Sequence, residues 1–80
     1  MTESRVWSRL TGIASDALNV DEADLRPQSS SDNTEGWTSL SHLRLLTRVE
    51  KEFGVRFRGS ELPQLDTLAK IEVAVMARIA

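Results

Sequence analysis

One amphipathic helix near the middle of the chain constrains the fold most, because the residues that should begin and end it are both recognisable. Thr38 is a good N-cap residue, since its hydroxyl can accept a hydrogen bond from an otherwise unpaired amide of the first turn. Gly36 lets the chain bend into that start, and Gly54 stands where a left-handed residue commonly ends a helix. We therefore expect a helix over residues 39–53.

The apolar side chains of this helix divide between two sides when they are placed about 100° apart per residue. One arc should pack in the core and contains Leu45, Leu46, Val49 and Phe53. The opposite side mixes leucines with bases, which favours a contact surface for a protein partner. Its residues are Thr38, Leu40, Leu43, Arg44, Thr47, Arg48 and Lys51. Exposed leucines are common in folded proteins, so a surface without function is the alternative.

A second amphipathic helix precedes this one, over about residues 4–18, and Asn19 should stop it. Its apolar stripe consists of Val6, Leu10, Ile13, Ala14 and Ala17. Trp7 lies beside the stripe, and we expect it to pack at the rim of the core rather than to serve as a binding platform.

The segment 19–37 has no sustained periodicity, and Pro27 with the polar run 29–33 favours a loop. Such a loop is long for a small domain. A flexible linker is the alternative, although it would leave two halves too small to fold separately.

The chain after Gly54 should contain an extended connector, one short helix over about residues 60–65 and a last helix over 67–79. Residues 55–58 alternate apolar and basic side chains, but the sequence offers no partner strand. The last helix has a clean apolar stripe of Leu68, Ile71, Val75 and Ile79. The prediction is therefore an all-α bundle of three main helices and one short helix, forming a single domain over residues 1–80.

Length and composition exclude several classes of protein. Eighty residues build one small core, and the absence of cysteine removes disulfides and thiolate metal sites, so a cytoplasmic location is expected. No apolar run approaches the roughly 18 residues of a membrane span, and the N-terminus lacks the apolar core of a signal peptide. A net charge of -2 argues against nucleic-acid binding. His42 is expected to be solvated, and no catalytic pair or metal site is visible.

The charge is unevenly distributed. Residues 16–35 carry six acids against one arginine, whereas residues 39–58 carry five bases against two acids. The loop is therefore acidic and the central helix is basic. A small DNA-binding helical domain is one reading of that basic helix.

Three motifs carry a family resemblance: Gly36-Trp37-Thr38-Ser39-Leu40, then Leu43-x-Leu45-Leu46, then Val49-Glu50-x-Glu52-Phe53-Gly54-Val55. Together they resemble the acyl carrier protein family, whose attachment signature is Asp-Ser-Leu, often preceded by Trp, and the resemblance extends from Val6 to about Ile79. It implies an acyl-carrier-like bundle with a long first loop, which a few apolar side chains, here Val20, Leu25 and Trp37, hold against the core. It also implies that the Ser39 hydroxyl carries a 4'-phosphopantetheine arm derived from coenzyme A, whose thiol holds acyl cargo as a thioester. Thr38 stands where the family normally has Asp, and Glu35 is a nearby source of negative charge.

The resemblance further implies partners. A phosphopantetheinyl transferase would install the arm, and an acyltransferase, ketosynthase or other acyl-processing enzyme would use it. The equivalent helix of many fatty-acid carriers is acidic, whereas this one is basic, so we expect partners with neutral, apolar or acidic surfaces in polyketide or other secondary metabolism. We expect a discrete, monomeric carrier rather than an enzyme, with no nucleic-acid or membrane partner. Two alternatives stay open: a peptidyl or aminoacyl carrier, and an unmodified carrier-like interaction module, which the Thr38 departure favours.

Overall fold

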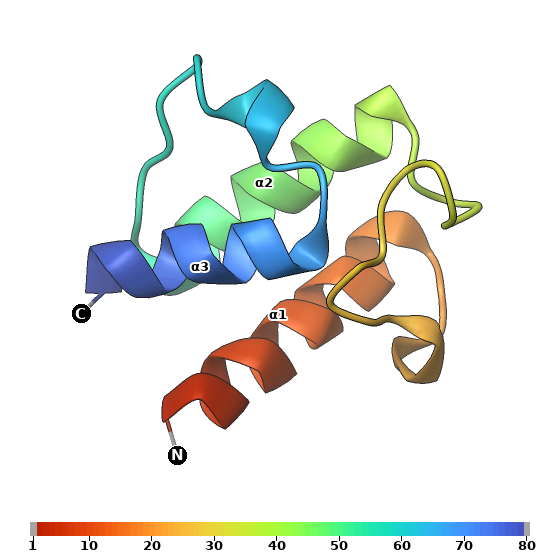
Figure 1. Ribbon diagram of the computed structural model, residues 1–80, viewed down its shortest axis with the longest axis horizontal. Helices are drawn as coiled ribbons and strands as arrows, with labels where there is room; N and C mark the ends of the chain where they lie inside the picture. Colours follow the sequence, from red (N-terminus) through yellow and green to blue (C-terminus); the bar gives the residue numbers. More distant parts are fainter. Residues whose placement is uncertain (1, 80) are drawn as a thin grey trace.

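Three main helices are arranged as a bundle (Figure 1), and their apolar stripes form the core of the protein. The computed structural model describes residues 2–79. Its elements, in chain order, are α1 (Thr2–Leu18), η1 (Glu22–Asp24), α2 (Ser39–Phe53), η2 (Leu62–Gln64) and α3 (Leu68–Ile79). Within the described residues the only β-type pairing is one isolated bridge between Ser30 and Thr67. The all-α bundle with a long first loop is confirmed.

Each main helix contributes fully buried residues to this core. The side chains with no exposed surface include Leu10 of α1, Leu45 and Val49 of α2, and Leu68, Ile71 and Val75 of α3. Three expected core residues lie nearer the surface: Ala17 and Phe53 are half-buried, and Ile79 is exposed because it ends α3. Trp7 is half-buried against the core, as expected. Apolar burial of this kind is the main favourable contribution to the folding of so small a domain.

The long loop after α1 is held by hydrogen bonds as well as by apolar contacts. Leu25 and Trp37 are buried, and Val20 packs against the core. The backbone carbonyl groups of Pro27 and Ser29 accept hydrogen bonds from the first amides of α3, at 2.8 and 3.2 Å. These carbonyls satisfy helix amides that would otherwise lack partners. The loop therefore forms the N-terminal cap of α3 and is not a flexible linker.

Two left-handed residues end the first two main helices. Asn19 follows α1 with φ 58°, and Gly54 follows α2 with φ 65°. Gly36, in the turn before α2, does not have a left-handed φ. A Cβ atom at this position would lie 2.1 Å from the backbone oxygen of Leu18. Gly36 is needed for the close approach of this turn to the end of α1.

The short helix is a single 3-10 turn, η2, which is shorter than the helix expected over about residues 60–65. Glu61 precedes it and accepts a 2.8 Å hydrogen bond from the backbone N–H of Arg58, and its carboxylate also pairs with Arg78 of α3. The Arg58 amide and the Arg78 guanidinium hold the pKa of Glu61 below its usual value. Residues 55–58 form an extended connector without a strand, as expected.

Candidate functional site

The start of α2 is built by a reciprocal pair of hydroxyl groups. Thr38 is the N-cap residue, and its side chain accepts a hydrogen bond from the backbone N–H of Ser41 at 3.2 Å. In return, the Ser41 side chain accepts one from the backbone N–H of Thr38 at 2.7 Å. The Ser41 hydroxyl also donates to the carbonyl group of Gly36 at 2.7 Å. This is a capping box, in which Ser41 takes the position usually held by Glu or Gln.

Ser39 is the first residue of α2 and differs from both of these neighbours. Its side chain is exposed, whereas Ser41 is buried. Within residues 2–79, its hydroxyl takes part in none of the hydrogen bonds that organise the helix start. It therefore presents a free hydroxyl where unpaired helix amides favour an attached anion such as a phosphodiester.

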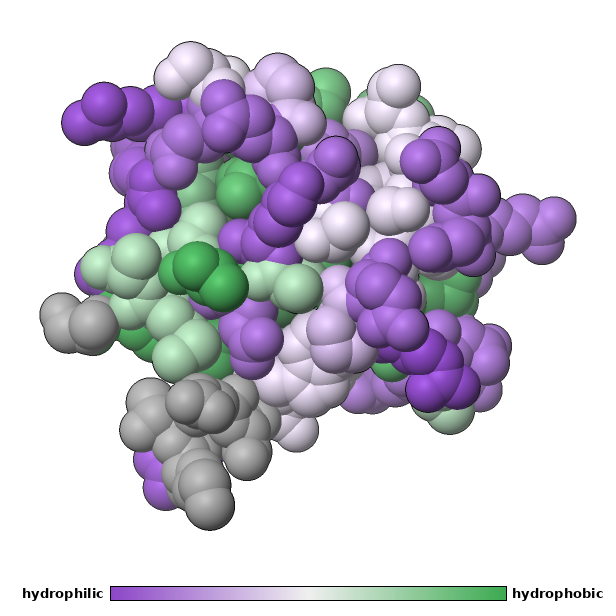
Figure 2. All heavy atoms as spheres, viewed as in Figure 1, coloured by the Kyte–Doolittle hydropathy of each residue, from purple (hydrophilic) through white to green (hydrophobic). Residues whose placement is uncertain are grey.

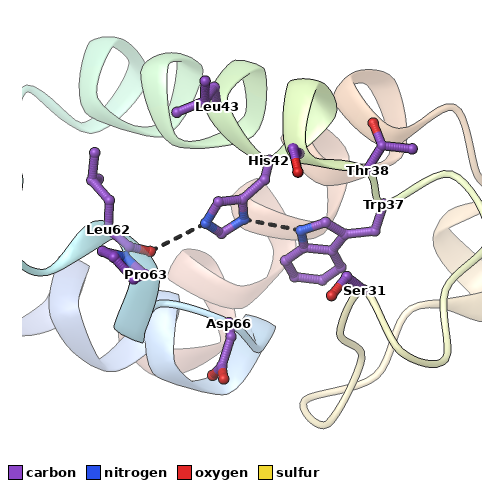
Figure 3. Close-up of a pocket in the computed structure, with 9 residues that line it drawn as sticks. Ser31, Trp37, Thr38, His42, Leu43, Leu62, Pro63 and Asp66 are labelled. Carbon is purple, nitrogen blue, oxygen red and sulfur yellow. Dashed lines mark hydrogen bonds between the residues drawn. The ribbon is translucent and has the colours of Figure 1, made fainter.

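Trp37 and His42 lie on either side of Ser39 in the sequence, and their side chains contact each other. The indole Nε1–H of Trp37 donates to Nδ1 of His42 at 3.0 Å, and Nε2 of His42 lies 3.2 Å from the carbonyl oxygen of Leu62 in η2 (Figure 3). The two rings stack, with their centroids 5.9 Å apart. Our expectation that His42 is solvated was wrong, because the ring is half-buried between these two partners.

A pocket of about 410 Å³ opens beside Ser39, between the start of α2 and the η2 segment (Figure 3). Its lining combines apolar and polar side chains and consists of Ser31, Trp37, Thr38, Ser39, His42, Leu43, Leu62, Pro63 and Asp66. Asp66 is ion-paired with Lys70 at 2.8 Å, and the Lys70 ammonium lowers the pKa of that carboxyl below its usual value. The pocket therefore carries an ionised carboxylate at one edge.

The predicted partner-binding residues of α2 lie at the surface. Leu40 is 62% exposed and Leu43 is 53% exposed, and the remaining residues of the set, Thr38, Arg44, Thr47, Arg48 and Lys51, are exposed as well. Leu43 borders both the pocket and a shallow hollow formed with Asp16, Ala17, Arg44, Thr47 and Arg48. The structure thus places these side chains on one exposed side of α2, next to Ser39.

The bases on this side of α2 are not equivalent. Arg48 forms a hydrogen-bonded ion pair with Asp16 at the end of α1, and this hydrogen bond raises the pKa of the guanidinium group. Arg44 and Lys51 make no ion pair within the described part of the chain. Two cations are therefore uncompensated on this face, whereas the charge of the third is largely matched internally.

Figure 2 shows an apolar area over α3. Val73, which belongs to this helix, is 66% exposed. In the part of the chain that the structure describes, no three acidic, histidine or cysteine side chains lie close enough to hold a metal ion. Over the same residues, no helix is both long and apolar enough to cross a membrane.

Comparison with known proteins decides the family. The family model described as the phosphopantetheine attachment site matches residues 8–74 of this chain. The chain belongs to this family. It is a carrier domain of the acyl carrier protein type, and its prosthetic group is a covalently attached 4'-phosphopantetheine.

Two curated relatives support the assignment. The acyl carrier protein of Cyanidioschyzon merolae (strain NIES-3377 / 10D) is 28% identical over 68 residues, which cover 85% of this chain and 75% of the relative. The acyl carrier protein of Thermosynechococcus vestitus (strain NIES-2133 / IAM M-273 / BP-1) is 28% identical over 71 residues, covering 89% of this chain and 88% of the relative. Proteins of this type carry acyl groups for enzymes and are not themselves catalysts.

The residues of the carrier domain fit such a group. A phosphodiester needs a free hydroxyl with donors nearby, and the arm beyond it contains amide groups and an apolar segment. The exposed Ser39 hydroxyl at the start of α2 suits the phosphodiester, and the mixed apolar and polar lining of the adjacent pocket suits the arm. The sequence did not reveal the roles of Ser41 and His42. A capping-box pattern that allowed Ser at its last position would have found Ser41.

Proposed function

We propose that Ser39 is the residue that carries the 4'-phosphopantetheine arm of this acyl carrier protein. One observation supports the proposal best: of the three hydroxyls at the start of α2, only that of Ser39 is both exposed and outside the capping network. Thr38 and Ser41 satisfy backbone amides, so modification of either would remove a cap worth about 1 kcal/mol.

Attachment converts the Ser39 hydroxyl into a phosphodiester. The serine oxygen forms a bond to the phosphorus that bears the pantetheine chain, the anhydride bond of coenzyme A breaks, and adenosine 3',5'-bisphosphate leaves. The proton passes to a base on the transferase. The N-terminal end of α2, where helix amides favour negative charge, then lies next to the phosphodiester. When bound, the group supplies a thiol that holds acyl cargo as a thioester.

As part of the same proposal, we assign this carrier protein to polyketide or other secondary metabolism. The support is the exposed side of α2, where Leu40 and Leu43 stand beside the uncompensated charges of Arg44 and Lys51. A partner for this surface would offer an apolar depression with a neutral or acidic rim. Such a partner differs from enzymes that bind acidic carriers through basic patches, which favours a dedicated set of acyl-processing enzymes.

Intact-mass measurement after incubation with coenzyme A and a broad-specificity phosphopantetheinyl transferase tests the attachment. The wild-type protein should gain one phosphopantetheine group, and Ser39→Ala should gain none. Ser60→Ala is a matched control, since that serine is also exposed but lies outside the start of α2. A full gain in Ser39→Ala would contradict the proposal.

The unmodified interaction module, which the Thr38 departure favours, is not retained, because the family model that matches the chain describes a phosphopantetheine attachment site. Threonine caps α2 as an aspartate would but supplies no carboxylate beside Ser39. A peptidyl or aminoacyl carrier would gain the same arm, and it would differ by accepting amino acids from an adenylating enzyme.

A further inference from the structure

The contact between Trp37, His42 and Leu62 joins three separate segments around the hydroxyl of Ser39. Trp37 lies in the turn before α2, His42 lies in the first turns of α2, and Leu62 begins η2. Ser39 and all three residues line the same pocket. Figure 3 shows the imidazole between the indole and the Leu62 carbonyl group, with a hydrogen bond to each.

The chemistry of the two partners determines which proton the imidazole carries. The indole nitrogen of Trp37 can only donate, and the carbonyl oxygen of Leu62 can only accept. Nδ1 of His42 must therefore offer a lone pair, and Nε2 must carry the hydrogen. The other neutral tautomer and the imidazolium would each place a ring hydrogen against the indole hydrogen and lose that bond.

The bridge also orders a segment that has few other attachments. η2 is a single turn, and its own hydrogen bonds connect residues close in sequence, such as that from the Leu62 amide to the Gly59 carbonyl at 3.4 Å. Its other long-range contacts are the packing of Leu62 and the buried Leu65 against the core and the pair between Glu61 and Arg78. Among the hydrogen bonds of residues 2–79, the bond from His42 to Leu62 connects η2 to the helix bearing Ser39.

We propose that His42, as a neutral imidazole with its hydrogen on Nε2, is a positioning residue for arm transfer to Ser39. It fixes Trp37 on one side of the pocket and η2 on the other, so that a transferase meets a preorganised surface. This inference rests on the proposed attachment at Ser39. Binding to a preorganised surface avoids the cost of ordering it. Loss of the bridge should therefore raise KM for the carrier and leave kcat unchanged, because the transferase supplies the chemistry.

Three variants separate the two hydrogen bonds from the shape of the ring. His42→Phe keeps a flat ring against Trp37 and removes both bonds. His42→Asn can keep an acceptor near the position of Nδ1, and His42→Gln can keep a donor near the position of Nε2. We expect KM to rise about three- to tenfold in His42→Phe, and by less in the other two, since each retains one bond.

Nitrogen-15 NMR of the imidazole tests the tautomer directly, and the rise in KM without a change in kcat separates the positioning role from a merely structural one. The chain contains one histidine, so its ring signals need no assignment. The wild-type spectrum at neutral pH should show a bare Nδ1 and a protonated Nε2, and Trp37→Phe should shift the ring toward a mixture of tautomers. Thermal melts followed by circular dichroism establish that each variant is folded; should His42→Phe fail to fold, His42→Asn and His42→Gln decide the kinetic question.

The outcomes are distinct. A raised KM with unchanged kcat, together with the expected tautomer, supports the positioning role. A protonated Nδ1 in the wild-type protein, or wild-type KM in all folded variants, overturns it while leaving Ser39 as the attachment residue. Failure of the wild-type protein to gain the arm refutes the proposed function itself.

Discussion

Substitution of Gly36 by alanine tests how closely the turn before α2 must approach the end of α1. A Cβ atom added to Gly36 would lie 2.1 Å from the backbone oxygen of Leu18 and 3.4 Å from the side chain of Val20. Carbon and oxygen atoms that are not bonded rarely approach within 3.0 Å, so the two segments must separate by about 0.9 Å. The obstructing atom belongs to the backbone and cannot rotate away.

The size of the effect follows from the cost of overpacking. Forcing one extra carbon into a packed site destabilises a protein by about 1–3 kcal/mol. For a domain of this size, that corresponds to a fall in Tm of about 5–20 °C. The displacement also reaches the site, because the carbonyl group of Gly36 accepts the 2.7 Å hydrogen bond from the Ser41 hydroxyl. We therefore expect Gly36→Ala to weaken the cap of α2 as well.

Urea and thermal unfolding followed by circular dichroism provide the assay. Gly12→Ala is a matched control, because Gly12 lies within α1 and a Cβ there meets nothing within 4 Å. That substitution should stabilise the protein by up to about 1 kcal/mol through higher helix propensity. Equal stability of Gly36→Ala and the wild-type protein would refute the reasoning from close approach.

Three further predictions concern the core, the surface charges and the dependence of stability on pH. Leu45→Ala should lower the free energy of unfolding by about 2–5 kcal/mol, whereas the exposed Leu43→Ala should change it by less than about 0.5 kcal/mol, as measured by urea titration. Arg44→Glu should lower kcat/KM with partner enzymes without changing Tm. Arg48→Glu should lower both kcat/KM and Tm, because it also breaks the pair with Asp16. Equal Tm values for the two variants would contradict this. The folded-state pKa of Glu61 is depressed, so its contribution to stability is full above the unfolded pKa and disappears as the pH falls through the folded one. Glu61→Gln should therefore have a lower Tm than the wild-type protein at neutral pH and the same Tm under strongly acidic conditions. A difference in Tm that does not depend on pH would contradict this role of the Glu61 carboxylate.

The features of the fold that could be predicted from the sequence are those set by neighbouring residues. The repeat of apolar side chains along each helix depends only on local spacing, and the core residues of α2, Leu45, Leu46 and Val49, follow from it. The cap at Thr38 and the left-handed Gly54 are likewise local properties. The exposure of Leu40 and Leu43 followed from the same spacing.

The features that could not be predicted depend on contacts between distant residues. His42 was placed in solvent because its carbonyl partner, Leu62, lies twenty residues away in another segment. The role of Gly36 depends on the position of the Leu18 backbone, which no local pattern contains. The capping of α3 by loop carbonyls and the pairing of Arg48 with Asp16 have the same origin.

Localisation of the arm by fragment mass spectrometry tests the central claim most directly. After loading with coenzyme A and a transferase, the peptide containing Thr38, Ser39 and Ser41 would be isolated and fragmented. We predict that the phosphopantetheine group is found on residue 39 alone, where the hydroxyl is exposed and outside the capping network. Its presence on Thr38 or Ser41, or on a peptide from another part of the chain, would contradict the account.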